Sequence, residues 1–200
     1  MSVMVCSPLR DKRAHISYII GLMQINGAYG GWMPMGGQGD IHVARTTLAN
    51  QFMKSKHDAL VFIDGDIGFT RQDFLELVGS DAVYVSGLYP GKADQPEFIY
   101  RDINMKVVPI DQVPRNGLHK VGLIPTGFLK IHRSVFETIA QKGVAQAYAK
   151  GQHHHFFPSL IVDDYLQSED YSFCHLAKQA GFTPVINAGI RLEHDGRRIP

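Results

Sequence analysis

Ala59-Leu60-Val61-Phe62-Ile63-Asp64-Gly65-Asp66 places five consecutive apolar residues directly before two carboxylates that are one residue apart. A continuous apolar run of this length predicts a strand buried on both faces, which is typical of a parallel sheet covered by helices. The polar residues then lie at the carboxyl end of that strand, where open α/β sheets bind their ligands. Residues 59–66 therefore indicate both an α/β fold and the position of its site.

Strand and helix patterns alternate along the rest of the chain. Short apolar runs predict further strands at residues 3–6, 82–88, 128–132, 183–187 and 190–193. Helical spacing predicts helices at residues 14–24, with Ile16, Ile19, Ile20 and Met23 as the apolar members, and at residues 41–55. Capping residues predict three more: one that begins at Thr70, one capped by Ser134, and one from Ser168 to Ala180 that ends before Gly181. This alternation favours a mixed, mostly parallel sheet flanked by helices.

Three segments interrupt this pattern. The glycine-dense residues 27–39 predict a long surface loop, and the first strand is expected to stop at Ser7-Pro8. Residues 98–100 and 106–110 read as short extended pieces around a polar turn. Residues 143–168 show no regular pattern. We see no internal repeat and no second domain, so residues 1–200 are expected to form one domain.

Charge and length narrow the function classes. The chain has 200 residues, with 20 Lys and Arg against 19 Asp and Glu, so it lacks the basic excess of a nucleic-acid-binding protein. Its length suits one compact domain. No apolar run approaches the roughly 20 residues needed to cross a bilayer. The only two cysteines, Cys6 and Cys174, lie far apart, which favours a reducing compartment. We therefore expect a cytoplasmic protein, and leave open a homo-oligomer or a longer polypeptide.

Asp64 and Asp66 are candidate ligands of a divalent cation. Two carboxylates separated by Gly65 can turn toward one point, and oxygen ligands favour Mg²⁺ or Mn²⁺. The alternative interpretation is a solvated turn after a strand, because Asp and Gly are common turn residues. The position directly after a five-residue buried strand favours the metal site.

Six further motifs follow in an order that resembles a known family. They are Ser7-Pro8-Leu9-Arg10, Ala44-Arg45-Thr46-Thr47, Ser86-Gly87-Leu88-Tyr89-Pro90 with Lys92, Pro125-Thr126-Gly127-Phe128, Ser168-Glu169-Asp170-Tyr171 and Glu193-His194-Asp195-Gly196. Together with the Asp-x-Asp motif they resemble a glycosyltransferase of the GT-A fold, of the small bacterial or viral type. The resemblance covers nearly the whole chain.

The resemblance implies a function and a set of site residues. It implies a single-domain, Rossmann-like GT-A fold with a nucleotide-binding half (residues 1–100) and an acceptor-binding half (residues 101–200). The implied activity is transfer of a sugar from a nucleotide-sugar, with UDP preferred over GDP, to a hydroxyl of a glycan or other acceptor. The implied donor-binding residues are Pro8, Leu9, Arg10, Arg45, Asp64, Gly65, Asp66, Lys92, Thr126 and Gly127.

Catalysis and the metal shell are assigned by the same resemblance. By similarity to inverting members, Asp170 is the general base and Glu169 binds the acceptor. A carboxylate that takes the proton of a sugar hydroxyl as the bond forms lowers the barrier. Carboxylates at a helix start are also favoured by the helix dipole alone, so a purely structural role stays open for both residues. His194 is expected to complete the metal shell, and imidazole beside two carboxylates suits Mn²⁺ better than Mg²⁺.

Other functions remain possible at this stage. A phosphatase of the haloacid-dehalogenase type also has a buried strand ending in Asp-x-Asp, and Ile161-Val162-Asp163-Asp164 resembles its later acidic pair. Against it, Gly68 stands where that family prefers Thr or Val. A catalytically inactive nucleotide-sugar-binding module would share every binding motif. A sugar nucleotidyltransferase would need a glycine-rich loop after the first strand, which residues 7–10 lack.

His153-His154-His155 invites a zinc interpretation. Three adjacent histidines on a regular backbone cannot all face one ion, and no cysteine lies nearby. We therefore expect this segment to be a flexible loop on the acceptor side.

Overall fold

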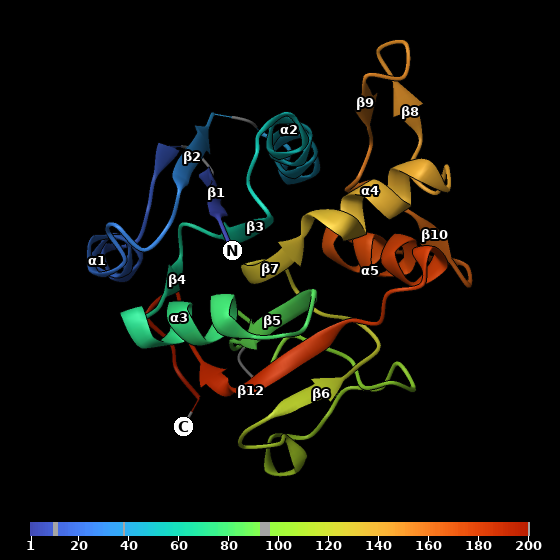
Figure 1. Ribbon diagram of the computed structural model, residues 1–200. Coiled ribbons are helices and arrows are strands. Elements are labelled where there is room, and N and C mark those ends of the chain that lie inside the picture. The colour runs from blue at the N-terminus through green and yellow to red at the C-terminus, as the bar shows by residue number, and fades with distance from the viewer. Residues whose placement is uncertain (10–11, 38, 93–96, 200) are drawn as a thin grey trace.

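A single seven-stranded sheet between two layers of helices organises the chain (Figure 1). The computed structural model describes residues 1–9, 12–37, 39–92 and 97–199. The sheet has the order β2-β1-β3-β7-β5-β12-β6, built from β1 (Val3–Leu9), β2 (Gly31–Gly36), β3 (Ala59–Ile63), β5 (Tyr84–Leu88), β6 (Leu118–Lys120), β7 (Phe128–His132) and β12 (Val185–Arg191). Strands β7 and β6 run antiparallel to their neighbours and the other five share one direction, so the sheet is mostly parallel, as predicted.

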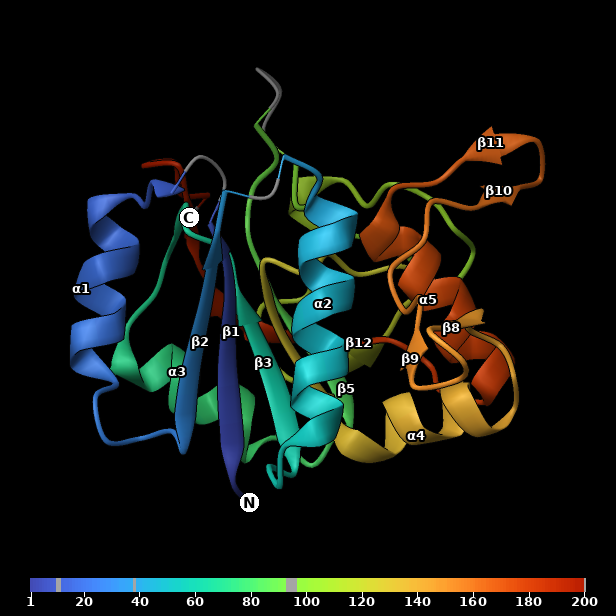
Figure 2. The same cartoon turned by 90° about the horizontal axis from the view of Figure 1, so that it is seen from above.

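The helices divide between the two faces of this sheet (Figure 2). They are α1 (Ile16–Gln24), α2 (Ile41–Lys54), α3 (Arg71–Gly79), α4 (Arg133–Gln141) and α5 (Glu169–Ala180), with a short 3₁₀ turn at Ile110–Gln112. One buried cluster joins α2, α4 and α5 to one face, and a second joins α1 and α3 to the other. Along β1, Met4 belongs to the first cluster and Val5 to the second, because successive side chains of a strand point to opposite faces.

Short paired strands complete the fold. They are β4 (Ile67–Gly68) with β13 (Glu193–His194), β8 (Ala147–Tyr148) with β9 (His153–His154), and β10 (Ile161–Val162) with β11 (Tyr165–Leu166). The first pair brings the end of the chain back beside the turn that follows β3, and the β10–β11 hairpin projects from the body of the molecule (Figure 2). No helix in the described part of the chain is both long and apolar enough to cross a membrane.

The prediction of a loop over residues 27–39 was wrong, because β2 forms within it. Its six residues pair in parallel register with Met4–Leu9, and β1 itself continues through Ser7-Pro8 instead of ending there. The glycines serve close packing here: a Cβ on Gly30 would lie 2.7 Å from the His57 ring. Pro34 is tolerated because β2 is an edge strand.

Three other boundaries also differ from the prediction. Residues 106–110 form no strand, because the Asp102 carboxylate accepts hydrogen bonds from the backbone N–H groups of Asn104 and Lys106 and closes a turn. Helix α4 is capped by His132, whose Nδ1 accepts from the Ser134 N–H, and not by Ser134. The strands expected at residues 183–187 and 190–193 are joined in one strand, β12, which carries an irregularity after Asn187, and the short β13 begins only at Glu193.

Helix α1 has the predicted spacing but presents its apolar stripe to solvent. Ile16 and Met23 are 63% and 73% exposed, and Ile19 and Ile20 are exposed as well. Tyr18 and Gly21 face the sheet instead. Gly21 permits this close approach, since a Cβ there would lie 2.6 Å from the ring of Phe69. In contrast, the capping box of α3 formed by Thr70 and Asp73 is confirmed, as is the left-handed Gly181 after α5.

Candidate functional site

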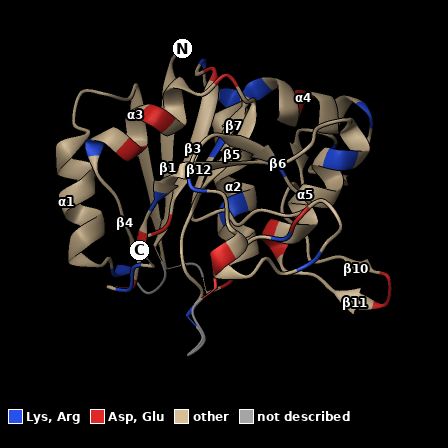
Figure 3. Ribbon diagram, turned by 90° about the horizontal axis from the view of Figure 1, so that it is seen from below, with Lys and Arg blue, Asp and Glu red and all other residues tan. Residues whose placement is uncertain are grey.

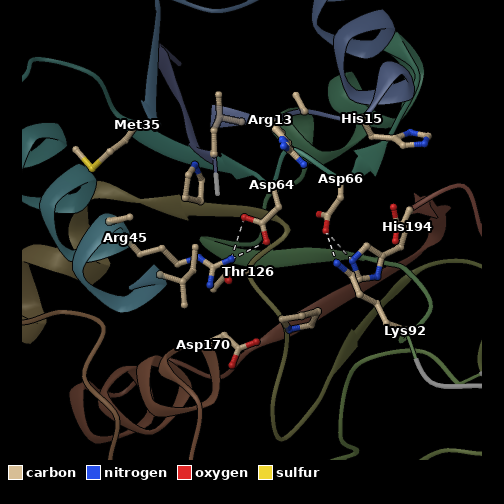
Figure 4. A pocket seen from close by; sticks show the side chains of 18 of the residues that line it. Arg13, His15, Met35, Arg45, Asp64, Asp66, Lys92, Thr126, Asp170 and His194 are labelled. Carbon is tan, nitrogen blue, oxygen red and sulfur yellow. Dashed lines mark hydrogen bonds and ion pairs between the residues drawn. The ribbon is translucent and has the colours of Figure 1, made fainter. Parts of the chain in front are cut away.

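A cavity of about 770 Å³ opens at the carboxyl ends of β1 and β3, between the starts of α1, α2 and α5 (Figure 4). It brings together ten of the residues that the sequence singled out: Pro8, Leu9, Arg45, Asp64, Gly65, Asp66, Lys92, Thr126, Asp170 and His194. Gly127 and Glu169 lie just behind its wall and contact residues that line it. Arg10 lies outside the described residues.

The turn from β3 to β4 is what aims the two aspartates into this cavity. The Asp64 N–H donates to the Gly127 carbonyl at 2.9 Å, and the His15 N–H donates to the Gly65 carbonyl at 2.6 Å. A Cβ on Gly65 would lie 2.8 Å from the Leu9 side chain, so the end of β1 packs directly on the Asp-x-Asp motif. The close packing of Leu9 on Gly65 explains why β1 and β3 share one site.

Asp64 is held by Arg45 from helix α2. Arg45 Nη2 donates to both Asp64 oxygens, at 2.9 and 2.6 Å, while its Nη1 donates to Glu169. The Arg45 side chain is 6% exposed. Burial disfavours its charge, but the negative charges of Asp64 and Glu169 more than offset this and raise the pKa of Arg45. Burial also raises the pKa of both carboxyl groups, against the opposing effect of Arg45. The three side chains thus form one largely buried group, in which a single guanidinium contacts two carboxyl groups.

Asp66 belongs to a second, more open group with Lys92 and His194. Asp66 Oδ2 accepts from Lys92 Nζ at 2.6 Å and lies 3.4 Å from His194 Nε2. Burial would raise the pKa of Asp66, but the hydrogen bonds from His194 and Lys92 outweigh it and lower that pKa. Asp66 is therefore a carboxylate at neutral pH. Figure 4 shows it pointing toward His194 and Lys92, and away from the Arg45 group.

Asp66 and His194 are side chains of the types that bind divalent cations. His194 Nδ1 lies 2.7 Å from the Pro90 carbonyl oxygen and donates to it, which leaves Nε2 to face Asp66. Such a second bond is the usual way in which a protein orients a metal-ligating imidazole. Asp64 fits less directly, because Arg45 occupies both of its oxygens. Within the described residues, no three His, Cys, Asp or Glu side chains already surround one point.

Asp170 faces the cavity from the first turn of α5. Its Oδ1 accepts from the Tyr171 N–H at 2.8 Å and from the Ser168 hydroxyl. Among the described residues no donor is bonded to Oδ2. Figure 4 places Asp170 on the opposite wall from Asp64 and Asp66, so the cavity lies between this carboxylate and the Asp-x-Asp motif.

Several lining residues were not assigned to the site from the sequence, although Tyr89 belongs to the motif at residues 86–90. Tyr89 is buried and its hydroxyl accepts from the Gly127 N–H at 2.7 Å, while its ring packs edge-on against His194. Its place directly after β5, at the same sheet edge as Asp64, is a signal that could have found it. Arg13 and His15 also line the cavity, from the segment before α1. Thr126 lines the cavity, and its Oγ1 is buried without a hydrogen-bond partner among the described residues.

The acidic pair Asp163-Asp164, which resembled a phosphatase motif, lies elsewhere. Both residues occupy the tight turn between β10 and β11, with φ values of 50° and 64°. Neither lines the cavity that contains Asp64 and Asp66. The phosphatase interpretation therefore lacks its second acidic motif at the site.

Comparison with solved structures identifies the architecture. No family model matches the chain, and no curated protein matches it in sequence. The structure of GalNAc-T7 with UDP, GalNAc and Mn²⁺ superposes on 98% of the chain, with a TM-score of 0.61 and 11% sequence identity. The chain has the glycosyltransferase GT-A fold. It spans only 43% of the GalNAc-T7 chain. A197 from STIV shares this GT-A fold with a TM-score of 0.64 and 16% identity, over 97% of this chain and 85% of that one.

Proposed function

We propose that this protein is a metal-dependent glycosyltransferase that moves a sugar from a nucleotide-sugar to an acceptor hydroxyl. The observation that carries the proposal is the grouping of Asp66, His194 and Lys92 at the carboxyl edge of a GT-A sheet, across one cavity from Asp170. Glycosyl transfer needs stabilisation of the leaving diphosphate and removal of the acceptor proton. Asp66 and His194 with a metal, together with Lys92, would supply the first, and Asp170 across the cavity would supply the second.

The donor is proposed to bind along the edge formed by β1, β3 and β5. Pro8, Leu9 and Gly65 form the wall nearest the start of the chain, and Thr126, with Gly127 behind it, forms the wall next to the Asp-x-Asp motif. Arg10 stays a proposed donor-binding residue by resemblance. Lys92 and Arg13 bring positive charge to this cavity, which suits a diphosphate. The structure of GalNAc-T7 that shares this fold contains UDP, so UDP is the first nucleotide to test.

Asp66 and His194 are proposed to hold Mn²⁺ or Mg²⁺, with Asp64 as the third ligand. A bound divalent cation would offset the negative charge that develops on the departing diphosphate. For Asp64 to contribute an oxygen, Arg45 has to release one of its two hydrogen bonds to that carboxylate. Nitrogen beside carboxylate oxygens favours Mn²⁺ of the two ions.

Asp170 is proposed to be the general base of an inverting transfer. The acceptor oxygen would form its bond to the anomeric carbon while the bond from that carbon to the diphosphate breaks, and the acceptor proton would pass to Asp170. Glu169 was expected to bind the acceptor, but its carboxylate is bonded to Arg45 and is largely buried. We therefore propose that Glu169 acts through Arg45, as a positioning residue.

Titration of UDP by calorimetry, with Mn²⁺ and then with EDTA, tests this function. Binding that requires the metal supports the proposed site, and UDP-sugars are then screened for turnover. Binding without turnover on any donor would favour the inactive binding module. No binding of UDP or GDP under either condition would contradict the proposal, and hydrolysis of p-nitrophenyl phosphate would then favour the phosphatase.

A further inference from the structure

A second cavity, of about 350 Å³, lies between helix α2 and the β8–β9 hairpin. It contains the part of the histidine run that the proposed function leaves unexplained. The side chains that the argument uses come from both walls: His42, Thr46 and Thr47 of α2, and Gln146, Tyr148 and His155 of the hairpin segment.

The hairpin wall of this cavity is fixed in place. The Asn50 side chain pairs with both backbone groups of His154, donating to its carbonyl at 2.8 Å and accepting from its N–H at 2.9 Å. The Phe157 N–H donates to Thr46 Oγ1, and Phe156 and Phe157 are fully buried in the core. His153 and His154 form strand β9, in place of the expected loop. A preformed wall lowers the entropic cost of binding a ligand.

The second cavity combines uncharged polar side chains with a mainly apolar surface, to which Val43 contributes. Among the described residues no Asp, Glu, Lys or Arg lines it, whereas the first cavity is lined by Arg13, Lys92 and several aspartates. Burial, with the nearby His42 ring at 6.3 Å, lowers the pKa of His155, so that imidazole is neutral at pH 7. Neutral imidazole, amide and hydroxyl groups both donate and accept hydrogen bonds, and Tyr148 adds an aromatic face. This combination matches the hydroxyl groups and apolar ring faces of a neutral sugar.

The two cavities lie next to one another on α2. His42 lines both of them, while Arg45 lines only the first and Thr46 only the second. A ligand that bound in both cavities would therefore pass over His42.

We propose that the second cavity is a subsite for a sugar unit of the acceptor, distant from the hydroxyl that reacts. The acceptor is then a neutral glycan of several units, and not a monosaccharide or a charged molecule. The identification of the bound glycan as the acceptor rests on the proposed function. Binding of the glycan to the subsite can be tested without any donor.

The test is binding of the wild-type protein to an array of immobilised neutral and acidic oligosaccharides, followed by NMR titration of the best binder. Wild type is expected to bind at least one neutral oligosaccharide and to bind its monosaccharide unit at least tenfold more weakly. Tyr148→Ala and Gln146→Ala should each weaken oligosaccharide binding about fivefold or more. Tyr165→Ala is the matched control, because Tyr165 is an exposed tyrosine of the β10–β11 hairpin that lines neither cavity.

Each outcome separates the subsite from the enzymatic function. Binding only to acidic glycans, binding to no glycan, or binding that Tyr148→Ala leaves unchanged would overturn the subsite. Metal-dependent UDP binding in that same sample would leave the proposed function standing. A third outcome is that Tyr148→Ala loses oligosaccharide binding while the wild-type protein binds neither UDP nor GDP. This outcome would support the subsite and contradict the transferase function.

Discussion

Arg45 Nη2 donates hydrogen bonds to both carboxylate oxygens of Asp64, at 2.9 and 2.6 Å, although the two residues come from different elements of the fold. The other end of the same guanidinium contacts Glu169 at the start of α5. One buried side chain of α2 thus joins the edge of the sheet to the helix that carries Asp170. Figure 3 marks the positions of the Lys, Arg, Asp and Glu residues along the ribbon, and of those in the described part of the chain only Arg45 and Lys130 are buried.

Removing Arg45 should destabilise the fold. Arg45→Met leaves Asp64 and Glu169 without the cation that both contact, and breaking a buried ion pair from one side costs at most about 3–5 kcal/mol when, as here, the carboxylates are partly exposed. The free energy of unfolding, measured by urea denaturation with circular dichroism, should fall by up to that amount. Arg71→Met, at an exposed arginine, is the matched control and should change it by less than about 0.5 kcal/mol. Equal losses in the two variants would contradict the central role of Arg45.

Asp66 should control metal-dependent binding of the donor nucleotide. Asp66→Ala removes the carboxylate that Lys92 and His194 share, so UDP binding should no longer differ between Mn²⁺ and EDTA. His194→Ala should shift the Mn²⁺ titration to higher concentration, because one imidazole ligand is lost. Calorimetry measures both effects, and Asp111→Ala, at an exposed aspartate, is the control. Metal-dependent binding at full affinity in Asp66→Ala would remove Asp66 from the proposed shell.

Asp170 should affect the chemical step and not the donor. Asp170→Asn keeps the shape of the side chain but cannot accept the acceptor proton, so transfer should slow by about 10²–10⁴-fold. Affinity for UDP should stay within about twofold of wild type. Single-turnover transfer assays beside calorimetry separate the two quantities. Asp163→Asn, in the exposed β10–β11 turn, controls for loss of an acidic side chain. Transfer at a near wild-type rate would make a retaining mechanism the next hypothesis.

The parts of the fold that the sequence predicts well are those set by local chemistry. The buried strand β3 and the capping box at Thr70 depend on residues that are adjacent or three apart, and both are present in the structure. The strand β2 was missed because its glycines match a loop, and only pairing with β1 makes them a strand. The exposed stripe of α1 was missed because spacing predicts a helix without telling which side faces the sheet.

The site residues also divide into those that local sequence predicts and those that only tertiary contacts bring together. Asp64 and Asp66 were expected at the carboxyl end of a buried strand, where α/β sheets bind ligands, whereas Lys92 was assigned to the donor only by resemblance. The contact between Arg45 and Glu169 joins residues 124 positions apart, and no local pattern encodes it. A resemblance of motifs could name both residues as site residues. It could not tell that they neutralise one another.

Lys130 provides a test of the fold away from the site. This lysine lies on β7 with 2% exposure, and its Nζ donates to the carbonyls of Val78 and Ser80 at the end of α3. Cations are favoured at that position, since the last carbonyls of a helix carry partial negative charge. Burial nevertheless lowers the pKa of Lys130 to about 8, with Asp81 opposing the shift.

Stability should therefore depend on pH through Lys130. Between about pH 8 and 10.5 the unfolded chain keeps a proton that the folded protein has lost, so raising the pH favours the folded state. The free energy of unfolding of wild type, minus that of Lys130→Met, should increase over this window by no more than about 1.4 kcal/mol per pH unit. Urea denaturation of both proteins at several pH values measures this difference, and the subtraction removes the titration of other groups. A difference that stays constant or decreases from pH 8 to 10 would mean that the buried ammonium group keeps its proton, and that its bonds to the end of α3 outweigh the cost of burial.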